Sequence, residues 1–155
     1  MRFASEMRFW RQALRREWRR LRTLALLRLR QVLGPRPLGA RGEDAAARFL
    51  RRQGCRVVAK GYRDRLGEID LVCVKDRRLV FVEVKTRRSE IAGQPVDAVD
   101  QQKQRRVTAA AERFIRRHDL QGIPVQFDVV SVVWPEHARS PKITHYSRAY
   151  EAISA

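Results

Sequence analysis

The chain of 155 residues is poor in the residue types that define several common classes of protein. It has only two cysteines, which excludes a disulfide framework and makes a reducing, cytoplasmic setting the default expectation. Its three histidines are scattered, so no spacing points to a zinc site. The one apolar run near the N-terminus, residues 24–29, is short and contains an arginine, which excludes a signal peptide or a membrane span there.

Acidic residues are also scarce relative to basic ones. The chain has 17 Asp and Glu against 34 Lys and Arg, which gives a net charge of +17 and a pI near 11.4. Most of the basic residues are arginine, whose planar side chain binds phosphate in a bidentate way. A field of this sign favours polyanionic partners, which means nucleic acid, an RNA-rich particle or an anionic membrane surface.

The N-terminal segment, residues 2–33, is especially rich in positive charge. Apolar residues recur at spacings of three and four over residues 2–33, with arginines between them, which predicts a basic amphipathic helix. Residues 34–37 (Gly-Pro-Arg-Pro) end it, so we predict an extension and linker over 1–37 and a second domain over 38–155. Three interpretations of the extension stay open: a helix that binds anionic lipid or nucleic acid, a helix that packs on the core or on a second copy, or the product of an upstream start codon.

The second domain alternates helical and extended patterns. We predict helices over 41–53 and 95–118 and a short helix at the C-terminus. We predict strands over 55–59, 67–74, 79–85 and 125–134 and a weak strand over 142–146, with a basic loop over 61–65 and another loop over 87–94. This order predicts an α/β fold, a mixed β-sheet flanked by helices.

The strands over 67–74 and 79–85 read as a hairpin that brings charged residues together. A turn centred on Asp76 and Arg77 places Asp70 opposite Glu83 and Glu68 opposite Lys85, all on one face. Two opposed carboxylates stand ~5 Å apart, which a sheet tolerates only with a cation or a shared proton between them. Oxygen ligands alone favour Mg²⁺ or Mn²⁺.

A plainer interpretation of the same four charges is a solvent-exposed strand end with a Glu68–Lys85 ion pair, which stabilises little. The rest of that face is apolar (Val72, Val74, Leu79, Phe81), which indicates that it is covered. Uncompensated charge beside a covered surface is costly, and this favours a functional site. A slip of one residue in the register would scatter the cluster.

Asp70 followed by Glu83-Val84-Lys85 resembles the D…ExK signature of the PD-(D/E)xK nuclease superfamily. A longer string is more specific and resembles the YraN family of small bacterial proteins, similar to archaeal Holliday-junction resolvases. It comprises Gly42 to Ala46, Tyr62-Arg63, Gly67 to Leu71, Phe81 to Arg87, Ala98-Val99, Lys103 and Phe127 to Val130. The resemblance spans Leu38 to Tyr150; one departure is Gly61, where an asparagine is expected.

The resemblance implies a restriction-endonuclease-like fold and a metal-dependent endonuclease that cleaves DNA, with branched or recombination intermediates as substrates. Asp70 and Glu83, with the Val84 carbonyl, would bind Mg²⁺ or Mn²⁺, and Lys85 would orient water and stabilise the transition state. Glu43 would complete the metal site, although an acid there also complements a helix dipole. A resolvase that cuts two symmetric strands would need two sites, hence a homodimer.

Other charged residues are candidates for supporting roles. Lys103 lies on the apolar stripe of its helix and either snorkels along the core edge or reaches a substrate phosphate. We expect Arg63, Arg65, Arg87 and Arg88 at the mouth of the site, Glu68 to hold Lys85, and Asp128 to be a structural carboxylate. Two further functions stay open: a non-catalytic nucleic-acid-binding module of the same fold, and a protein that binds a membrane surface or the ribosome through its N-terminal helix.

Overall fold

The structure is a computed structural model that describes residues 36–65, 67–89 and 100–153. The predicted amphipathic helix over residues 2–33 lies outside the described residues. No helix within those three ranges combines the length and the apolar character needed to cross a membrane.

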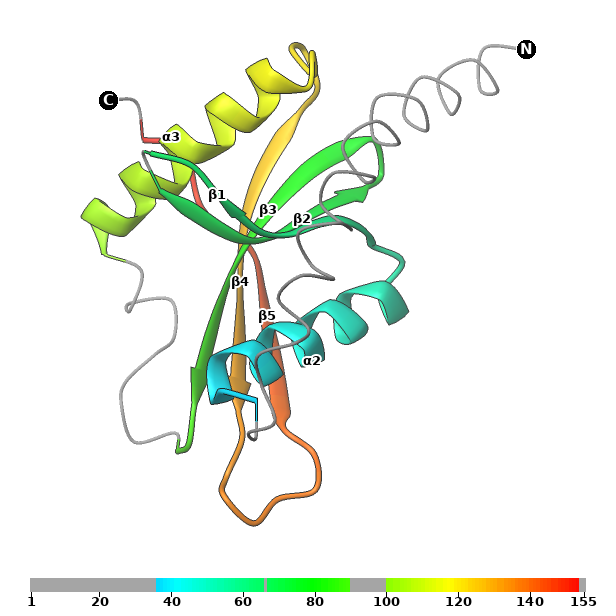
Figure 1. Ribbon diagram of the computed structural model, residues 1–155. Coiled ribbons are helices and arrows are strands. Elements are labelled where there is room, and N and C mark those ends of the chain that lie inside the picture. The colour runs from blue at the N-terminus through cyan, green and yellow to red at the C-terminus, as the bar shows by residue number, and fades with distance from the viewer. Residues whose placement is uncertain (1–35, 66, 90–99, 154–155) are drawn as a thin grey trace, which may run out of the picture. The chain divides into compact units, whose positions relative to one another are not determined.

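A single five-stranded sheet organises the described residues, with the strands in the order β1-β2-β3-β4-β5 (Figure 1). Its strands are β1 (Arg56–Arg63), β2 (Glu68–Lys75), β3 (Arg78–Arg87), β4 (Val125–Val133) and β5 (Lys142–Tyr150), and its helices are α2 (Leu38–Arg52) and α3 (Gln101–Arg117). Strands β3 and β4 pair in parallel, and the other neighbours are antiparallel. The predicted α/β architecture with a mixed sheet is therefore confirmed.

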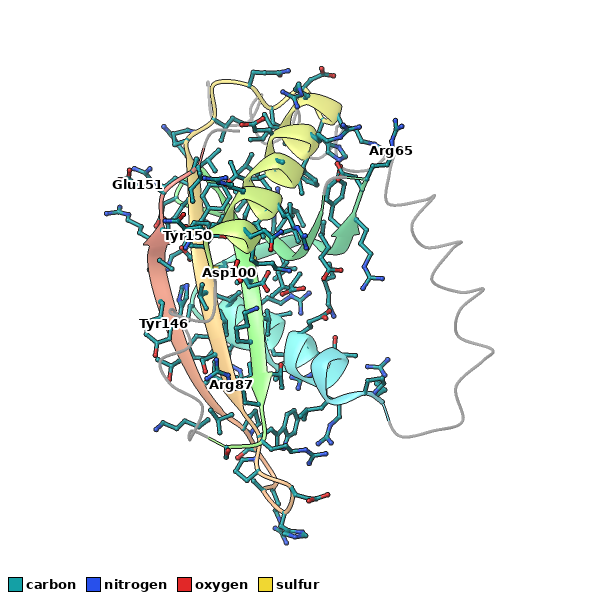
Figure 2. All side chains as sticks on the ribbon, turned by 90° about the vertical axis from the view of Figure 1, so that its left-hand side faces the viewer. Arg65, Arg87, Asp100, Tyr146, Tyr150 and Glu151 are labelled. Atoms are coloured by element: carbon teal, nitrogen blue, oxygen red, sulfur yellow. The ribbon has the colours of Figure 1, made fainter. Side chains whose placement is uncertain are left out.

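The two helices cover opposite faces of the sheet, α3 in front and α2 behind in Figure 2. On one face, Leu50 and the alanines of α2 join a core that contains Val80 and Val82 of β3. On the other face, Phe114 of α3 meets Phe81 edge to face, with ring centroids 5.9 Å apart. Because neighbouring residues of a strand point to opposite faces, residues 81, 83 and 85 all face α3.

The central hairpin has the predicted register. Val72 pairs with Phe81 and Val74 with Leu79, while Asp76 and Arg77 form the turn with φ values of 46° and 61°. Two successive positive φ values are typical of a type I′ turn, whose twist matches that of the flanking strands. The turn thus sets the register on which the charged cluster depends.

Several predicted boundaries were wrong. Residues 61–63 belong to strand β1 rather than to a basic loop, because Gly61 adopts a φ of 58° and the strand continues to Tyr62, which packs on Phe114. Helix α3 begins only at Gln101, where the Asp100 side chain caps it by accepting from the backbone N–H of Lys103.

The C-terminal end also differs from the prediction. Strand β5 runs on to Tyr150, and residues 151–153 form no helix. The predicted weak strand over 142–146 is thus the first half of a longer one, held by Tyr150 opposite Phe127 with the two rings stacked.

Helix α2 approaches β3 very closely at Gly42. A Cβ atom added there would lie 1.8 Å from the Thr86 hydroxyl, so only glycine fits without a shift of the backbone or of Thr86. This contact joins the turn of α2 that carries Glu43 to the stretch of β3 that carries Lys85. It therefore sets the relative positions of two predicted site residues.

Candidate active site

The site begins where β2 and β3 cease to pair. The last pair of the ladder is Leu71 with Val82. Beyond it, the Asp70 carboxylate accepts a hydrogen bond from the backbone N–H of Val84, with an Oδ2–N distance of 2.7 Å. A side chain thus takes the place of a ladder partner. Asp70 is thereby fixed on the Glu83 side of the hairpin.

Glu83 is a buried carboxylate at the centre of the site. Its side chain is only 4% exposed, yet one oxygen, Oε1, lies 2.9 Å from Lys85 Nζ and 3.3 Å from Lys103 Nζ. The other oxygen, Oε2, is buried and has no hydrogen-bond partner in the described part of the chain. A buried carboxylate oxygen without a partner is costly unless a cation or water binds it.

Lys103 connects helix α3 to the hairpin. The Lys103 ammonium also lies 3.7 Å from Glu68 Oε1. The other oxygen, Glu68 Oε2, forms an ion pair with Arg63 Nε at 3.1 Å. Lys103 therefore does not merely snorkel along the core edge. The expected Glu68–Lys85 pair was wrong, since Lys85 pairs with Glu83 and Glu68 pairs with Arg63 and Lys103.

The environment of Asp70 favours its protonated form. Burial, and next the negative charges of Glu83 and Glu43, raise the pKa of Asp70 to about 7. The Val84 N–H and the Lys103 ammonium act in the opposite direction. Glu43 of α2 is a third carboxylate within electrostatic range of Asp70, and its own pKa lies above its usual range, chiefly because of burial.

Comparison with known proteins supports the relationship that these residues indicated. Residues 42–132 match the family model described as "Uncharacterised protein family UPF0102". The chain belongs to the UPF0102 family. The resemblance to YraN proteins is thereby confirmed, and the mixed sheet between two helices agrees with a restriction-endonuclease-like fold.

Curated relatives come from several bacterial groups. A UPF0102 protein of Rhodopirellula baltica is 48% identical over 119 residues, which cover 75% of this chain and 71% of that protein. A UPF0102 protein of Solibacter usitatus is 49% identical over 118 residues, 75% of this chain and 87% of the relative. A third, from Rhodococcus opacus, is 42% identical over 113 residues, 73% and 95% of the respective chains.

The donor set of this UPF0102 protein fits a divalent cation with oxygen preference, but only in part. In its favour are two neighbouring carboxylates and the partnerless buried Oε2 of Glu83. The described residues contain no group of three His, Cys, Asp or Glu side chains close enough to hold a metal ion, which argues against a site in which protein ligands alone surround the cation. Glu43 therefore acts on Asp70 through its charge, and a cation here would keep positions for water or substrate, as Mg²⁺ usually does.

The predicted arginines do not form one cluster. Arg63 is bound to Glu68, whereas Arg65 and Arg87 stand well apart, Arg65 by the β1–β2 connection and Arg87 toward the far end of β3 (Figure 2). A further ion pair could not be predicted from the sequence: Arg113 of α3 lies 2.9 Å from Asp64 and ties the β1–β2 connection to the helix. Lys103 and Arg63 are thus the predicted substrate-binding residues that the structure places beside the carboxylates.

Asp128 has the structural role predicted for it. It is 2% exposed and accepts hydrogen bonds from Gln126 Nε2 and the Arg148 N–H, while His145 Nε2 lies 2.8 Å from its Oδ2. Burial alone would raise the pKa of Asp128, but these three partners together lower it. The carboxylate is fully occupied by protein groups and is not available to a metal ion at Glu83.

The raised pKa of Asp70 makes a prediction about stability. In the unfolded chain its pKa is ~3.9, so between about pH 4 and 7 the unfolded state releases a proton that the folded state retains. Stability from this group is fully present below pH 4 and is lost as the pH rises to 7. In EDTA, the free energy of unfolding of Asp70→Asn minus that of the wild type should therefore increase between pH 4 and 7 and stay constant above pH 7. Parallel pH profiles of the two proteins, measured by urea unfolding, would contradict the assignment.

Proposed function

We propose that this UPF0102 protein is a metal-dependent phosphodiesterase that cleaves DNA. The observation that carries the proposal is the buried Glu83 carboxylate, which has one oxygen without a partner, lies beside Asp70 and is flanked by two lysines. Carboxylates for a cation and ammonium groups for a phosphate, side by side on a strongly basic protein, fit phosphodiester chemistry better than other hydrolytic chemistries.

Asp70 and Glu83 would hold the cation, and Mg²⁺ or Mn²⁺ would supply Lewis acidity toward the phosphodiester. Side chains of the protein would bind the phosphate and stabilise the transition state. Lys85 and Lys103, from a strand and from a helix, would hold a non-bridging phosphate oxygen and stabilise the negative charge that develops on it. In the absence of substrate the same lysines neutralise Glu83, which keeps the buried carboxylate compatible with the fold.

The exposed arginines of α3 would contact the DNA backbone. Arg105, Arg106 and Arg116 lie on the solvent side of this helix, on the same side of the sheet as Lys103. Contacts of this kind neutralise phosphates, make affinity strongly salt-dependent and position the duplex without reading its sequence. We propose branched or flapped DNA as the substrate on the strength of the family's similarity to junction resolvases.

The test is cleavage of four-way junctions, flaps and linear duplexes in Mg²⁺ or Mn²⁺, with EDTA as the control. We expect metal-dependent cleavage of at least one branched substrate, faster than that of the duplex. Cleavage that persists in EDTA would contradict the proposal.

A second candidate is a non-catalytic nucleic-acid-binding module. It is favoured by one observation: Glu83 is already compensated by two lysines, and no third ligand approaches within the described ranges. In that case DNA binding would be indifferent to Mg²⁺, and no branched substrate would be cut.

A further inference from the structure

A cavity lies at the end of the sheet where β4 begins and β5 ends. Its volume is about 410 Å³, within the ~300–1,000 Å³ of ordinary small-molecule sites. Figure 2 shows Tyr150 and Glu151 on either side of the point where β5 ends. The lining consists of Arg78, Val125, Gln126, Phe127, Arg148, Tyr150, Glu151 and Ala152.

Three charged residues, Arg78, Arg148 and Glu151, line this cavity. Neither Arg78 nor Arg148 forms an ion pair with any residue in the described ranges, and neither does Glu151, although all three line one cavity. Elsewhere in these ranges Arg63 and Arg113 are paired with carboxylates. Two arginines that line one cavity and form no ion pair in the described ranges are suited to an anion that both guanidinium groups can bind.

The backbone of Arg148 is held in an unusual conformation. Its φ is 53°, in the left-handed region that non-glycine residues rarely adopt. At this point the β4–β5 register shifts, so that residues 147–149 lie opposite Asp128 alone. A β-bulge changes the direction in which a side chain points. A left-handed backbone at a non-glycine residue persists only where surrounding contacts hold it.

The buried Asp128 supplies those contacts. One of its oxygens accepts from both the Arg148 N–H, at 2.9 Å, and Gln126 Nε2, at 2.8 Å, and Gln126 Nε2 also lies 3.0 Å from Ser147 Oγ. One carboxylate thus holds the backbone of Arg148 and the side-chain amide of Gln126, two residues that line the cavity. The backbone that carries the Arg148 side chain is therefore already positioned before a ligand binds, which reduces the entropy lost on binding.

We propose that this cavity binds the terminal phosphate of a nucleotide. Arg78 and Arg148 bind the phosphate monoester, whose two negative charges match the two guanidinium groups. The apolar wall of Val125 and Tyr150 contacts the sugar and base, and Glu151 accepts from a hydroxyl or amino group of the nucleoside. The phosphate comes either from a free nucleotide or from the end of a DNA strand.

One arginine of this cavity lies far from the carboxylate cluster, since Arg78 precedes Glu83 by five residues on β3, which corresponds to ~17 Å along the strand. Tyr150, in contrast, lies within electrostatic range of Glu83 and Asp70. Binding is therefore measured in EDTA, where metal-dependent hydrolysis cannot take place, so that the inference is tested independently of the proposed hydrolysis.

The experiment is calorimetric titration of the full chain with deoxyadenosine 5′-monophosphate at 150 mM salt. We compare wild type with Arg78→Gln/Arg148→Asn, in which asparagine tolerates the left-handed backbone of residue 148. The matched control is Arg52→Gln/Arg56→Gln, which removes the same charge from exposed positions of α2 and of β1, the strand at the opposite edge of the sheet. We expect at least a tenfold loss of affinity in the first variant and less than a twofold change in the second.

Three results would overturn the proposal: no binding to the wild type, equal weakening in both variants, or deoxyadenosine binding as tightly as its monophosphate. The two sources of phosphate are distinguished by oligonucleotides with a 5′-phosphate or a 5′-hydroxyl. Displacement of the mononucleotide only by the phosphorylated strand supports a DNA end as the ligand. Failure of both strands to displace it supports a free nucleotide.

Discussion

Asp70→Asn should reduce metal-dependent cleavage to the level seen in EDTA. The substitution keeps an oxygen that can accept from the Val84 N–H, so the local fold is preserved while the charge that a cation needs is removed. The matched control is Asp76→Asn in the exposed hairpin turn, which makes the same chemical change outside the site and should leave the rate unchanged. Rates are measured on whichever branched DNA the wild type cuts fastest.

Lys85→Ala should lower the same rate by roughly 10²–10³-fold, the effect of removing one group that stabilises a developing negative charge. DNA affinity should change only a few-fold, because one of many phosphate contacts is lost. Cleavage that persists in both Asp70→Asn and Lys85→Ala would place the chemistry elsewhere. Affinity that collapses in parallel with the rate would show that Lys85 binds DNA rather than acting in catalysis.

Gly42→Ala should destabilise the protein by about 1–3 kcal/mol, as other overpacking substitutions do. The added methyl group would overlap the Thr86 hydroxyl and approach the Thr86 Cβ atom to 2.8 Å. Helix α2 must then move away from β3, and Glu43 and Lys85, which neighbour the two clashing residues, move with it. We therefore expect lower catalytic activity as well as a lower melting temperature.

Gly39→Ala on the same helix is the control. No atom lies within 4 Å of a Cβ atom built at Gly39, so the melting temperature should stay the same or rise slightly, as helix propensity favours alanine. Thr86→Ala in the Gly42→Ala background removes the closest clash and should recover part of the lost stability. Equal effects of the two glycine substitutions would mean that helix propensity, not the α2–β3 contact, sets the stability.

The central hairpin could be predicted in detail because its turn and its apolar pattern agree. Asp76 and Arg77 leave one register for the flanking strands, and the structure has that register. The juxtaposition of Asp70, Glu83 and Lys85 follows from it. Lys103 could be placed only near the site, since its ammonium reaches Glu83 through tertiary packing of α3.

Other features depend on contacts that local patterns do not contain. The start of α3 is set by the cap at Asp100, and β1 continues through Gly61 because Tyr62 packs on Phe114. The C-terminal residues are held as a strand by Tyr150 stacking on Phe127 rather than by their own propensity. The bulge at Arg148 is likewise invisible in the sequence, because Asp128, twenty residues earlier, supports it.

Calorimetric titration with Mn²⁺ and Mg²⁺ tests most directly whether the carboxylate pair is a metal centre. Wild type is compared with an Asp70→Asn/Glu83→Gln double variant, with and without DNA, at pH 8, where Asp70 is ionised. We predict a saturable binding event in the wild type that is absent from the double variant. Equal binding by both proteins, or no binding by the wild type even with DNA present, would contradict the account.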